Sequence, residues 1–240
     1  MAEAVIVSTA RTAMSKSVRG LFNNTHGITL ASHALSHAMV RAGVDPADVE
    51  DVVLGCAYPE GATGFNIGRN AAMAAGCPTS AAGMTVNRYC SSGLQAIAIA
   101  AGRVINEGVP VMAAGGVESI SLVQFGGSAN MSHAREENLF NRLPALWMTM
   151  IETAEIVADR YDVSRESQDE FALLSQQRTA AAQKAGLYDD EIVPLETTWK
   201  KVDRETKEES FEQVVADRDD CNRPDTTLEG LASLQPVFKD

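Results

Sequence analysis

Short apolar runs and amphipathic stretches alternate along the first half of the chain. Residues 4–8 (AVIVS) form an apolar run, which predicts a buried strand. Residues 29–42 repeat apolar side chains at helical spacing, and Gly43 follows, as is common at the end of a helix. The apolar face of this helix consists of Leu30, Ala31, Ala34, Leu35, Ala38 and Met39. The first unit is therefore a strand followed by a helix.

The same alternation continues to about residue 118. Strands are expected at 51–56, 84–87 and 109–115, helices at 66–75 and 91–107, and a helical turn at Asp45-Pro46. Strands that alternate with helices are typical of a parallel or mixed sheet covered by helices. The pattern predicts an α/β core over residues 1–118.

The pattern changes at Ser119. Residues 125–139 have loop character, and helices are expected at 153–161 and, after the N-cap Ser164, up to Lys184 before Gly186. Strands at 192–201 and 210–215 are expected to pair around a charged turn, and a short helix is expected at 228–234. We therefore expect a helix-rich second domain over residues 119–240.

Composition supports a folded, soluble protein. Of the 240 residues, 45% are hydrophobic and 22% are charged, which is enough to bury a sizeable core. No apolar run approaches the roughly 20 residues that a bilayer requires, so no contact with a membrane is expected. The first residues lack the basic segment of a secretion signal, and a cytoplasmic location is the expectation.

The charge is distributed unevenly. The net charge is −12, yet residues 1–118 hold 8 acidic and 7 basic residues, whereas residues 119–240 hold 24 and 13. An acidic surface repels the phosphate backbone, and aromatic residues, on which bases stack, are only 5% of the chain. Nucleic-acid binding is therefore disfavoured, and an anionic ligand would need a local basic site.

The cysteine and histidine spacings match no disulfide framework and no zinc site. Cys56 and Cys77 are interpreted as small buried side chains. His33 and His37 share a helix face without a carboxylate partner, and we expect them to be exposed or half-buried helix positions. No metal is expected.

Cys90 is the strongest nucleophile candidate. It stands where a predicted strand ends and a helix begins, and a helix N-terminus stabilises a thiolate. Ser91, Ser92 and Gly93 are small, so a substrate can approach the thiol and backbone N–H groups can face an oxyanion. The residues alone leave a second interpretation equally open, in which Cys90 is one more buried hydrophobic side chain.

The segment Asn87 to Ala96, N-R-x-C-x-S-G-L-Q-A, resembles the nucleophile motif of the thiolases, which include acetyl-CoA acetyltransferases and 3-ketoacyl-CoA thiolases. The resemblance continues in order along the whole chain. It includes Ala10-Arg11-Thr12, Pro59-Glu-Gly61, Asn66-Ile-Gly-Arg69, Gly115-Gly-Val-Glu-Ser119, Thr153-Ala-Glu155, Ser164-Arg-Glu-Ser-Gln-Asp169, Ser175-Gln-Gln-Arg178 and Asp190-Glu-Ile-Val-Pro194.

The resemblance implies a layered core of two similar α/β halves, with a loop domain inserted in the first. Residues 1–118 would be the first core half and residues 119–240 the loop domain that binds coenzyme A. The second half of the family carries a G-H-P motif, whose His activates the nucleophile, and a C-x-G-G-G motif, whose Cys moves a proton. Neither motif occurs here. We therefore expect the C-terminal half to be absent, as the apolar ending LASLQPVFKD also suggests, and residues 1–240 alone to be inactive.

The resemblance also implies substrate-binding residues. Arg223 occupies a position where the family offers a basic side chain to the nucleotide end of coenzyme A, although a solvent-facing Arg is an equally good interpretation of this residue in isolation. Met150 matches a Met of the acyl pocket, where Ile151 replaces the usual Gly. Gln176, within the S-Q-Q-R match, is expected among the residues that bind coenzyme A.

The implied activity is acyl transfer through a thioester on Cys90, in Claisen condensation of acetyl-CoA or in thiolytic cleavage of a 3-ketoacyl-CoA, as in fatty acid β-oxidation. Coenzyme A thioesters would be the substrates, and no cofactor is needed because the thioester keeps the acyl group activated. A homo-oligomer, dimer or tetramer, is expected, and the missing half is either a separate chain or lies outside these residues. A non-catalytic module that binds coenzyme A or serves assembly is the alternative. A ketoacyl synthase or a cysteine hydrolase fits the flanking motifs less well.

Overall fold

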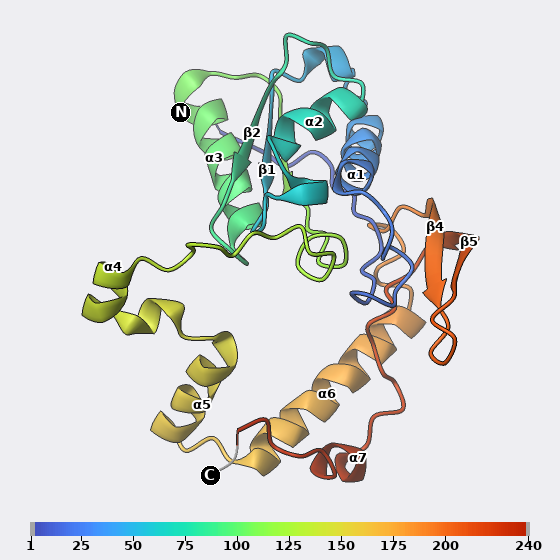
Figure 1. The fold of residues 1–240 in the computed structure, drawn as a ribbon. Coiled ribbons are helices and arrows are strands. Elements are labelled where there is room, and N and C mark those ends of the chain that lie inside the picture. Colours follow the sequence, from blue (N-terminus) through green and yellow to red (C-terminus); the bar gives the residue numbers. More distant parts are fainter. Residues whose placement is uncertain (1–2, 239–240) are drawn as a thin grey trace. The chain divides into compact units, whose positions relative to one another are not determined.

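The computed structural model describes residues 3–238, and Figure 1 shows the order of its elements. Its strands are β1 (Asp51–Gly55), β2 (Ala82–Val86), β3 (Met112–Gly116), β4 (Leu195–Val202) and β5 (Glu209–Ala216). Its α-helices are α1 (Gly27–Ala42), α2 (Ile67–Ala74), α3 (Ser92–Glu107), α4 (Glu137–Arg142), α5 (Met150–Arg160), α6 (Arg165–Lys184) and α7 (Leu228–Ala232). Short 3-10 helices occupy Pro46–Asp48, Gly61–Thr63 and Pro144–Trp147.

The chain divides into two compact units. The first comprises Met1–Asn130 and Asp189–Cys221, and the second comprises Met131–Tyr188 and Asn222–Asp240. Residues 189–221, which the sequence pattern placed in the second domain, therefore pack with the first part of the chain. The assignment of residues 1–118 and 119–240 as core half and loop domain stays a prediction, because a compact unit and a functional domain need not coincide.

A parallel sheet of order β2-β1-β3 forms the centre of the first unit. Helix α3 packs against β3 and β1, while α2 packs against β2 and β1 and is covered in turn by α1 (Figure 1). The predicted alternation of strands and helices is therefore confirmed from β1 to β3. Each parallel pair needs a crossover connection, and the helices α2 and α3 provide it.

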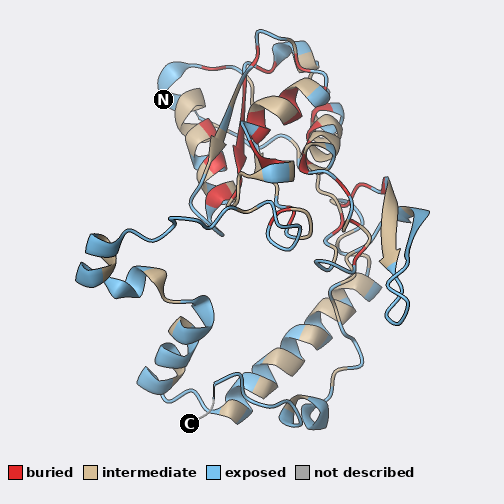
Figure 2. Cartoon of the chain, viewed as in Figure 1, coloured by how far each residue is buried: buried red, intermediate tan, exposed pale blue. Residues whose placement is uncertain are grey.

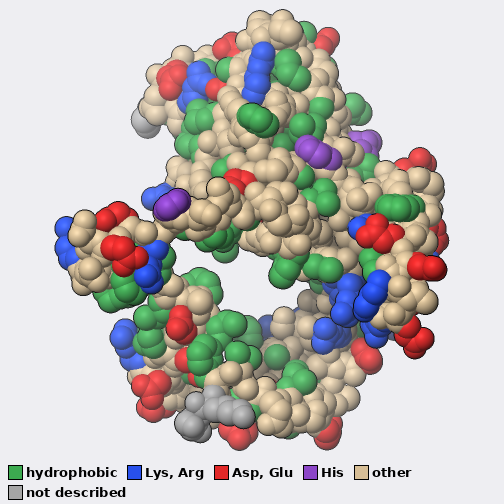
Figure 3. Space-filling view, viewed as in Figure 1, with side chains coloured by type: hydrophobic (Ala, Val, Ile, Leu, Met, Phe, Trp, Pro, Cys, Tyr) green, Lys and Arg blue, Asp and Glu red, His purple; other side chains and the backbone are tan. Residues whose placement is uncertain are grey.

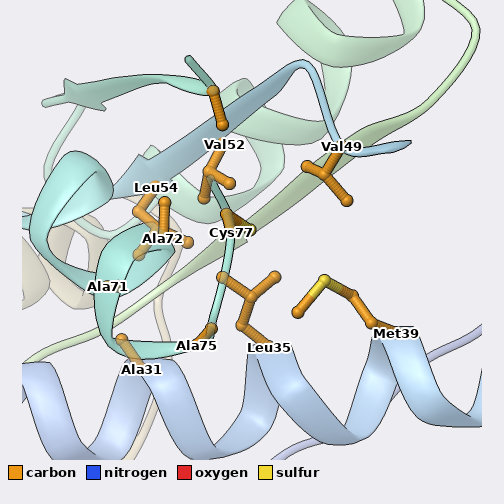
Figure 4. Close-up of a cluster of buried hydrophobic side chains, with 11 residues drawn as sticks. Ala31, Leu35, Met39, Val49, Val52, Leu54, Ala71, Ala72, Ala75 and Cys77 are labelled. Carbon is orange, nitrogen blue, oxygen red and sulfur yellow. The ribbon is translucent and has the colours of Figure 1, made fainter. Parts of the chain in front are cut away.

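The main core lies between the sheet and α1. Figure 4 shows Leu35 and Met39 on α1 facing Val49, Ala75 and Cys77, and the cluster continues through Val52 and Leu54 of β1. The helix ends as predicted, because Gly43 adopts the left-handed conformation and its N–H returns to the last turn. The helical spacing of apolar side chains in residues 29–42 therefore identified the buried face.

The strand predicted at residues 4–8 is wrong. No residue of this segment belongs to a strand in the described part of the chain, and Val5, Ile6 and Val7 are 70–75% exposed. The only β-pairing of the neighbouring Arg11 within the described residues is an isolated bridge with Ile192. An apolar run becomes a buried strand only where a neighbouring strand accepts its hydrogen bonds, and no strand of residues 3–238 lies alongside it.

The strands β4 and β5 form the predicted antiparallel hairpin. Lys200 pairs with Glu209 and Lys201 with Glu212, and Figure 3 shows opposite charges side by side on this face. The hairpin also holds the segment before α1, because the Asn23 amide donates to the Lys200 carbonyl at 2.8 Å. Residues 189–221 therefore belong structurally to the first unit.

The second unit is helical and thinly packed. Helices α5 and α6 begin and end close to their predicted limits, with the N-caps Thr149 and Ser164. Helix α4 begins inside the stretch 125–139 that was predicted as a loop, so that prediction is wrong for residues 137–139. The carboxylate of Glu136 caps the start of this helix. Among the described residues of the four helices α4, α5, α6 and α7 none is buried, and Figure 2 shows the buried residues, in red, on the first unit instead.

Two further expectations concern the histidines of α1 and the possibility of a membrane-spanning helix. His33 and His37 are half-buried on α1 as predicted, with ring centroids 4.6 Å apart. Burial, and then the neighbouring His37, lowers the pKa of His33. Within residues 3–238 no helix has the length and apolar character needed to cross a membrane.

Candidate active site

Cys90 lies on the turn that joins β2 to α3. Its side chain is exposed, which removes the interpretation of Cys90 as a buried hydrophobic residue. Ser91 is the N-cap residue of α3, and the next amides belong to the first turn of a helix, where N–H groups lack acceptors within the helix. An exposed thiol beside such amides can attack an acyl carbon while N–H groups face the developing oxyanion.

The turn contains an unusual backbone conformation one residue before the thiol. Tyr89 has a φ of 48°, in the left-handed region that a bulky side chain seldom adopts. Its N–H donates to Asn87 Oδ1 at 2.9 Å, and its carbonyl accepts from Ser92 Oγ at 2.6 Å. Ser92 Oγ also accepts the N–H of Arg88 at 2.8 Å. Side chains on both sides of the turn therefore fix the approach to Cys90.

Three glycines bring the sheet close to the start of α3. A Cβ atom on Gly55, at the end of β1, would lie 2.5 Å from the backbone nitrogen of Gly93. Gly116, at the end of β3, has the same role, since its Cβ would lie 3.1 Å from the Gly55 carbonyl oxygen and 3.5 Å from the Gly93 Cα. The N-terminus of α3, and Cys90 with it, is thus mounted on the carboxyl ends of two strands.

Glu118 joins the ends of β3 and β1. Its carboxylate accepts the N–H of Ala57 at 2.8 Å and that of Tyr58 at 3.3 Å, and the Cys56 thiol donates to it over 3.7 Å. Burial, and then the charge of Glu118, raises the pKa of Cys56 to about 11. Cys56 is therefore a neutral structural thiol, as expected, and Cys77 is likewise buried.

The sequence pattern did not indicate the roles of Asn87 and Ser92 in holding this turn, or that of Glu118 at the adjoining ends of β1 and β3. Each of the three lies in a segment that resembles the thiolases, but the resemblance implied no contact for any of them. A local signal existed for Asn87, because an Asn directly after a strand commonly accepts the N–H two residues later. No comparable signal existed for Glu118, whose acceptor role depends on two strands ending side by side.

The second unit brings together two of the predicted substrate-binding residues. Gln176, half-buried on α6, accepts the N–H of Arg223 and the side-chain amide of Asn222, both at 2.8 Å. The Arg223 side chain is exposed. Met150 lies apart in sequence at the first position of α5 and is 73% exposed. Gln176 therefore orients the backbone that carries Arg223, a role that the sequence pattern did not indicate.

A known protein family matches almost the whole chain. The family described as "Thiolase, N-terminal domain" matches residues 4–240. The chain is 40% identical over 240 residues to the 3-ketoacyl-CoA thiolase of Bacillus subtilis (strain 168), covering 99% of this chain and 60% of the relative. It is 36% identical over 244 residues to the acetyl-CoA acetyltransferase of Rhizobium meliloti (strain 1021), covering 98% of this chain and 58% of the relative.

Known structures give the same result. The crystal structure of the Bacillus anthracis acetyl-CoA acetyltransferase superposes with a TM-score of 0.81 at 34% identity, covering 100% of this chain and 60% of that chain. The chain thus spans about three fifths of the length of these relatives and corresponds to their N-terminal portion. The exposed Cys90 turn, the parallel sheet behind it and these similarities place the chain in the thiolase family.

Proposed function

We propose that the protein is an acyl-CoA C-acyltransferase that carries its acyl group on Cys90. The observation that supports this proposal best is the exposed thiol on a braced turn at the N-terminus of α3. The Cys90 thiolate attacks the carbonyl carbon of an acyl-CoA, a new sulfur–carbon bond forms, and the bond to the coenzyme A sulfur breaks. Coenzyme A leaves as its thiolate, so the thioester is exchanged without a redox change.

The second half-reaction transfers the acyl group onward. Its acceptor is the α-carbon of acetyl-CoA in condensation, whereas in thiolysis the acyl group passes to coenzyme A. The relatives carry names for both directions, acetyl-CoA acetyltransferase and 3-ketoacyl-CoA thiolase. The His that activates the nucleophile and the second Cys match no residue of the 240. Residues 1–240 alone are therefore expected to show little turnover.

We further propose that residues 119–240 bind coenzyme A. Arg223 supplies a cation in a region that is otherwise strongly acidic, and a guanidinium pairs with phosphate and stacks on adenine. Gln176 holds the Arg223 backbone, and Met150 contributes to the acyl pocket. A cytoplasmic homo-oligomer, dimer or tetramer, completes the proposal.

Mass spectrometry after incubation with acetyl-CoA tests the central step. The protein is tested together with the C-terminal half that carries the activating His. It is expected to gain one acetyl group, and peptide mapping should place it on Cys90. The variant Cys90→Ser should gain no stable acetyl thioester under the same conditions. Acetylation of a different cysteine would contradict the assignment, and calorimetric binding of coenzyme A without any acylation would favour a non-catalytic module.

A further inference from the structure

The backbone strain at Tyr89 is the starting point. A non-glycine residue in the left-handed region costs conformational energy, and such residues persist only where the surroundings hold them. Packing of the Tyr89 ring does not stabilise this conformation, because the residue is 71% exposed. The left-handed conformation must therefore be stabilised by hydrogen bonds to the N–H and the carbonyl of Tyr89.

Asn87 supplies those bonds in a way that reaches beyond the turn. Its Oδ1 accepts the Tyr89 N–H at 2.9 Å, which closes a ring over the two residues that precede Cys90. Its Nδ2 donates to the Ala57 carbonyl at 2.9 Å, in the segment that follows β1 and that Glu118 also binds. One amide group thus ties the strained residue to the end of the neighbouring strand.

Ser92 fixes the other side of Tyr89 but does so from α3. Its hydroxyl donates to the Tyr89 carbonyl at 2.6 Å and is buried with the residue, which is only 3% exposed. This bond ties the turn to its own helix, whereas the Asn87 amide ties it to the sheet. Loss of Asn87 would therefore remove the acceptor of the Tyr89 N–H and the bond to Ala57, while Ser92 would still hold the Arg88 N–H and the Tyr89 carbonyl from α3.

We infer that Asn87 is a positioning residue for the nucleophile: its amide keeps Tyr89 left-handed and thereby sets the direction in which the Cys90 thiol faces the acyl group. The inference rests on the proposed role of Cys90 as acyl carrier. It identifies a physical reason for an Asn three residues before the nucleophile. The inference also requires that Asn87 act through the conformation of residue 89. This requirement can be tested in variants whose stability is measured separately.

A double-mutant cycle provides that test, because glycine adopts the left-handed region without the cost that other residues have. The measured quantity is the single-turnover rate of Cys90 acylation by acetyl-CoA, in the protein that includes the C-terminal half with the activating His. Asn87→Ala is expected to lower the rate at saturation about tenfold, with the half-saturating concentration unchanged. In a Tyr89→Gly background the same substitution should lower the rate by less than about threefold, since residue 89 no longer needs to be held.

Tyr89→Ala is the matched control, because it removes the ring but keeps the Cβ atom that disfavours the left-handed region. In this background Asn87→Ala should again lower the acylation rate about tenfold. Asn87→Ser, whose hydroxyl can still accept the Tyr89 N–H, should retain more activity than Asn87→Ala and covers the case in which the alanine variant does not fold. Thermal midpoints are measured for every variant.

Each outcome has a distinct meaning. Equal losses in all three backgrounds, with the wild type acetylated at Cys90, would overturn the positioning role of Asn87 alone. An unchanged rate in a folded Asn87→Ala variant would overturn it as well. A wild type that takes no acetyl group on Cys90 would overturn the proposed function, and the positioning role with it.

Discussion

Gly55 and Gly93 approach so closely that a Cβ atom on Gly55 would lie 2.5 Å from the Gly93 backbone nitrogen. Real Cβ atoms do not come so near to backbone atoms, so Gly55→Ala must displace the first turn of α3. We expect a loss of about 1–3 kcal/mol in the free energy of unfolding, as for overpacked cores, together with slower acylation of Cys90. Denaturant titration and single-turnover acylation measure the two effects.

Gly102→Ala is the control for this substitution. Gly102 lies on the same helix, and the nearest atom to its added Cβ would be the Asn106 amide nitrogen at 3.9 Å. Removing a glycine from the interior of a helix should raise stability by about 0.5–1 kcal/mol. If Gly55→Ala proved as harmless as Gly102→Ala, the proposed mounting of α3 on the end of β1 would be incorrect.

Cys90 should be the first cysteine of the described chain to react with iodoacetamide at neutral pH. Only the thiolate is nucleophilic, and the pKa of Cys56 is raised to about 11 by burial and by Glu118. Burial also raises the pKa of Cys77, and burial with the charge of Asp220 raises that of Cys221. Timed alkylation followed by peptide mapping measures the order of reaction.

The cysteine experiment has an internal control. Cys90→Ser should remove the fast phase of alkylation and leave the slow modification of the other thiols unchanged. Unfolding the protein in guanidinium chloride should then expose Cys56 and Cys77 to the reagent. Rapid labelling of Cys56 in the folded protein would show that the buried, neutral thiol has been assigned wrongly.

Asp219 should stabilise the fold in a pH-dependent manner. Burial disfavours its charge, but hydrogen bonds from Arg11 and from the Met14 N–H, with the charge of Arg11, outweigh burial and lower the pKa of Asp219. A lowered folded pKa gives stability that is fully present above the unfolded pKa of about 3.9 and is lost as pH falls through the folded pKa. Asp219→Asn should therefore cost about 1.5–3 kcal/mol at pH 7.

Urea titrations at pH 7 and at about pH 3 measure this effect. The difference between the wild type and Asp219→Asn should shrink at the lower pH, because the Asp219 carboxyl of the unfolded wild type is then protonated and folding must remove that proton. The exposed Asp217 lies in the same segment, so Asp217→Asn should change stability by less than about 0.5 kcal/mol at either pH. A pH-independent difference for Asp219→Asn would exclude the ionic contribution.

Gln176 should influence coenzyme A affinity through Arg223. Gln176→Ala removes the acceptor of the Arg223 N–H, so the loop that carries the guanidinium is expected to loosen and Kd for coenzyme A to rise about five- to tenfold. Gln176→Glu keeps an acceptor and should have a smaller effect. Calorimetric titration with coenzyme A measures Kd, and Gln177→Ala on the exposed neighbour is the control. An unchanged Kd in Gln176→Ala would separate this residue from the binding site.

Elements whose stability depends on local chemistry could be predicted from the sequence. Helix α1, with its apolar spacing and Gly43 cap, and helix α6, with its Ser164 cap, lie where the pattern placed them. The strand at residues 4–8 failed because pairing depends on a neighbour, which no local pattern specifies. Helix α4 was missed because its six residues carry too few apolar positions for a period to be visible.

In the candidate site, too, features that depend on local sequence could be predicted and long-range contacts could not. Cys90 could be found because its motif and its position between a strand and a helix are local features. The contacts of Glu118 with Ala57 and of Asn87 with the Ala57 carbonyl join segments 61 and 30 residues apart. Such contacts depend on the order of strands in the sheet, and a pattern of apolar positions does not encode that order. The pairing of Arg11 with Asp219 is more distant still.

The separation of Arg11 and Asp219 in the sequence has a consequence for synthesis of the chain. The two residues are 208 positions apart, and the whole second unit except its last segment is translated between them. At about 5–20 residues per second, the ribosome needs about 10–40 s to bring Asp219 to the Arg11 that it will bind. The nascent segment before α1 is therefore synthesised well before the hairpin and the Asp219 carboxylate that it contacts, and it must stay free of wrong contacts during this interval.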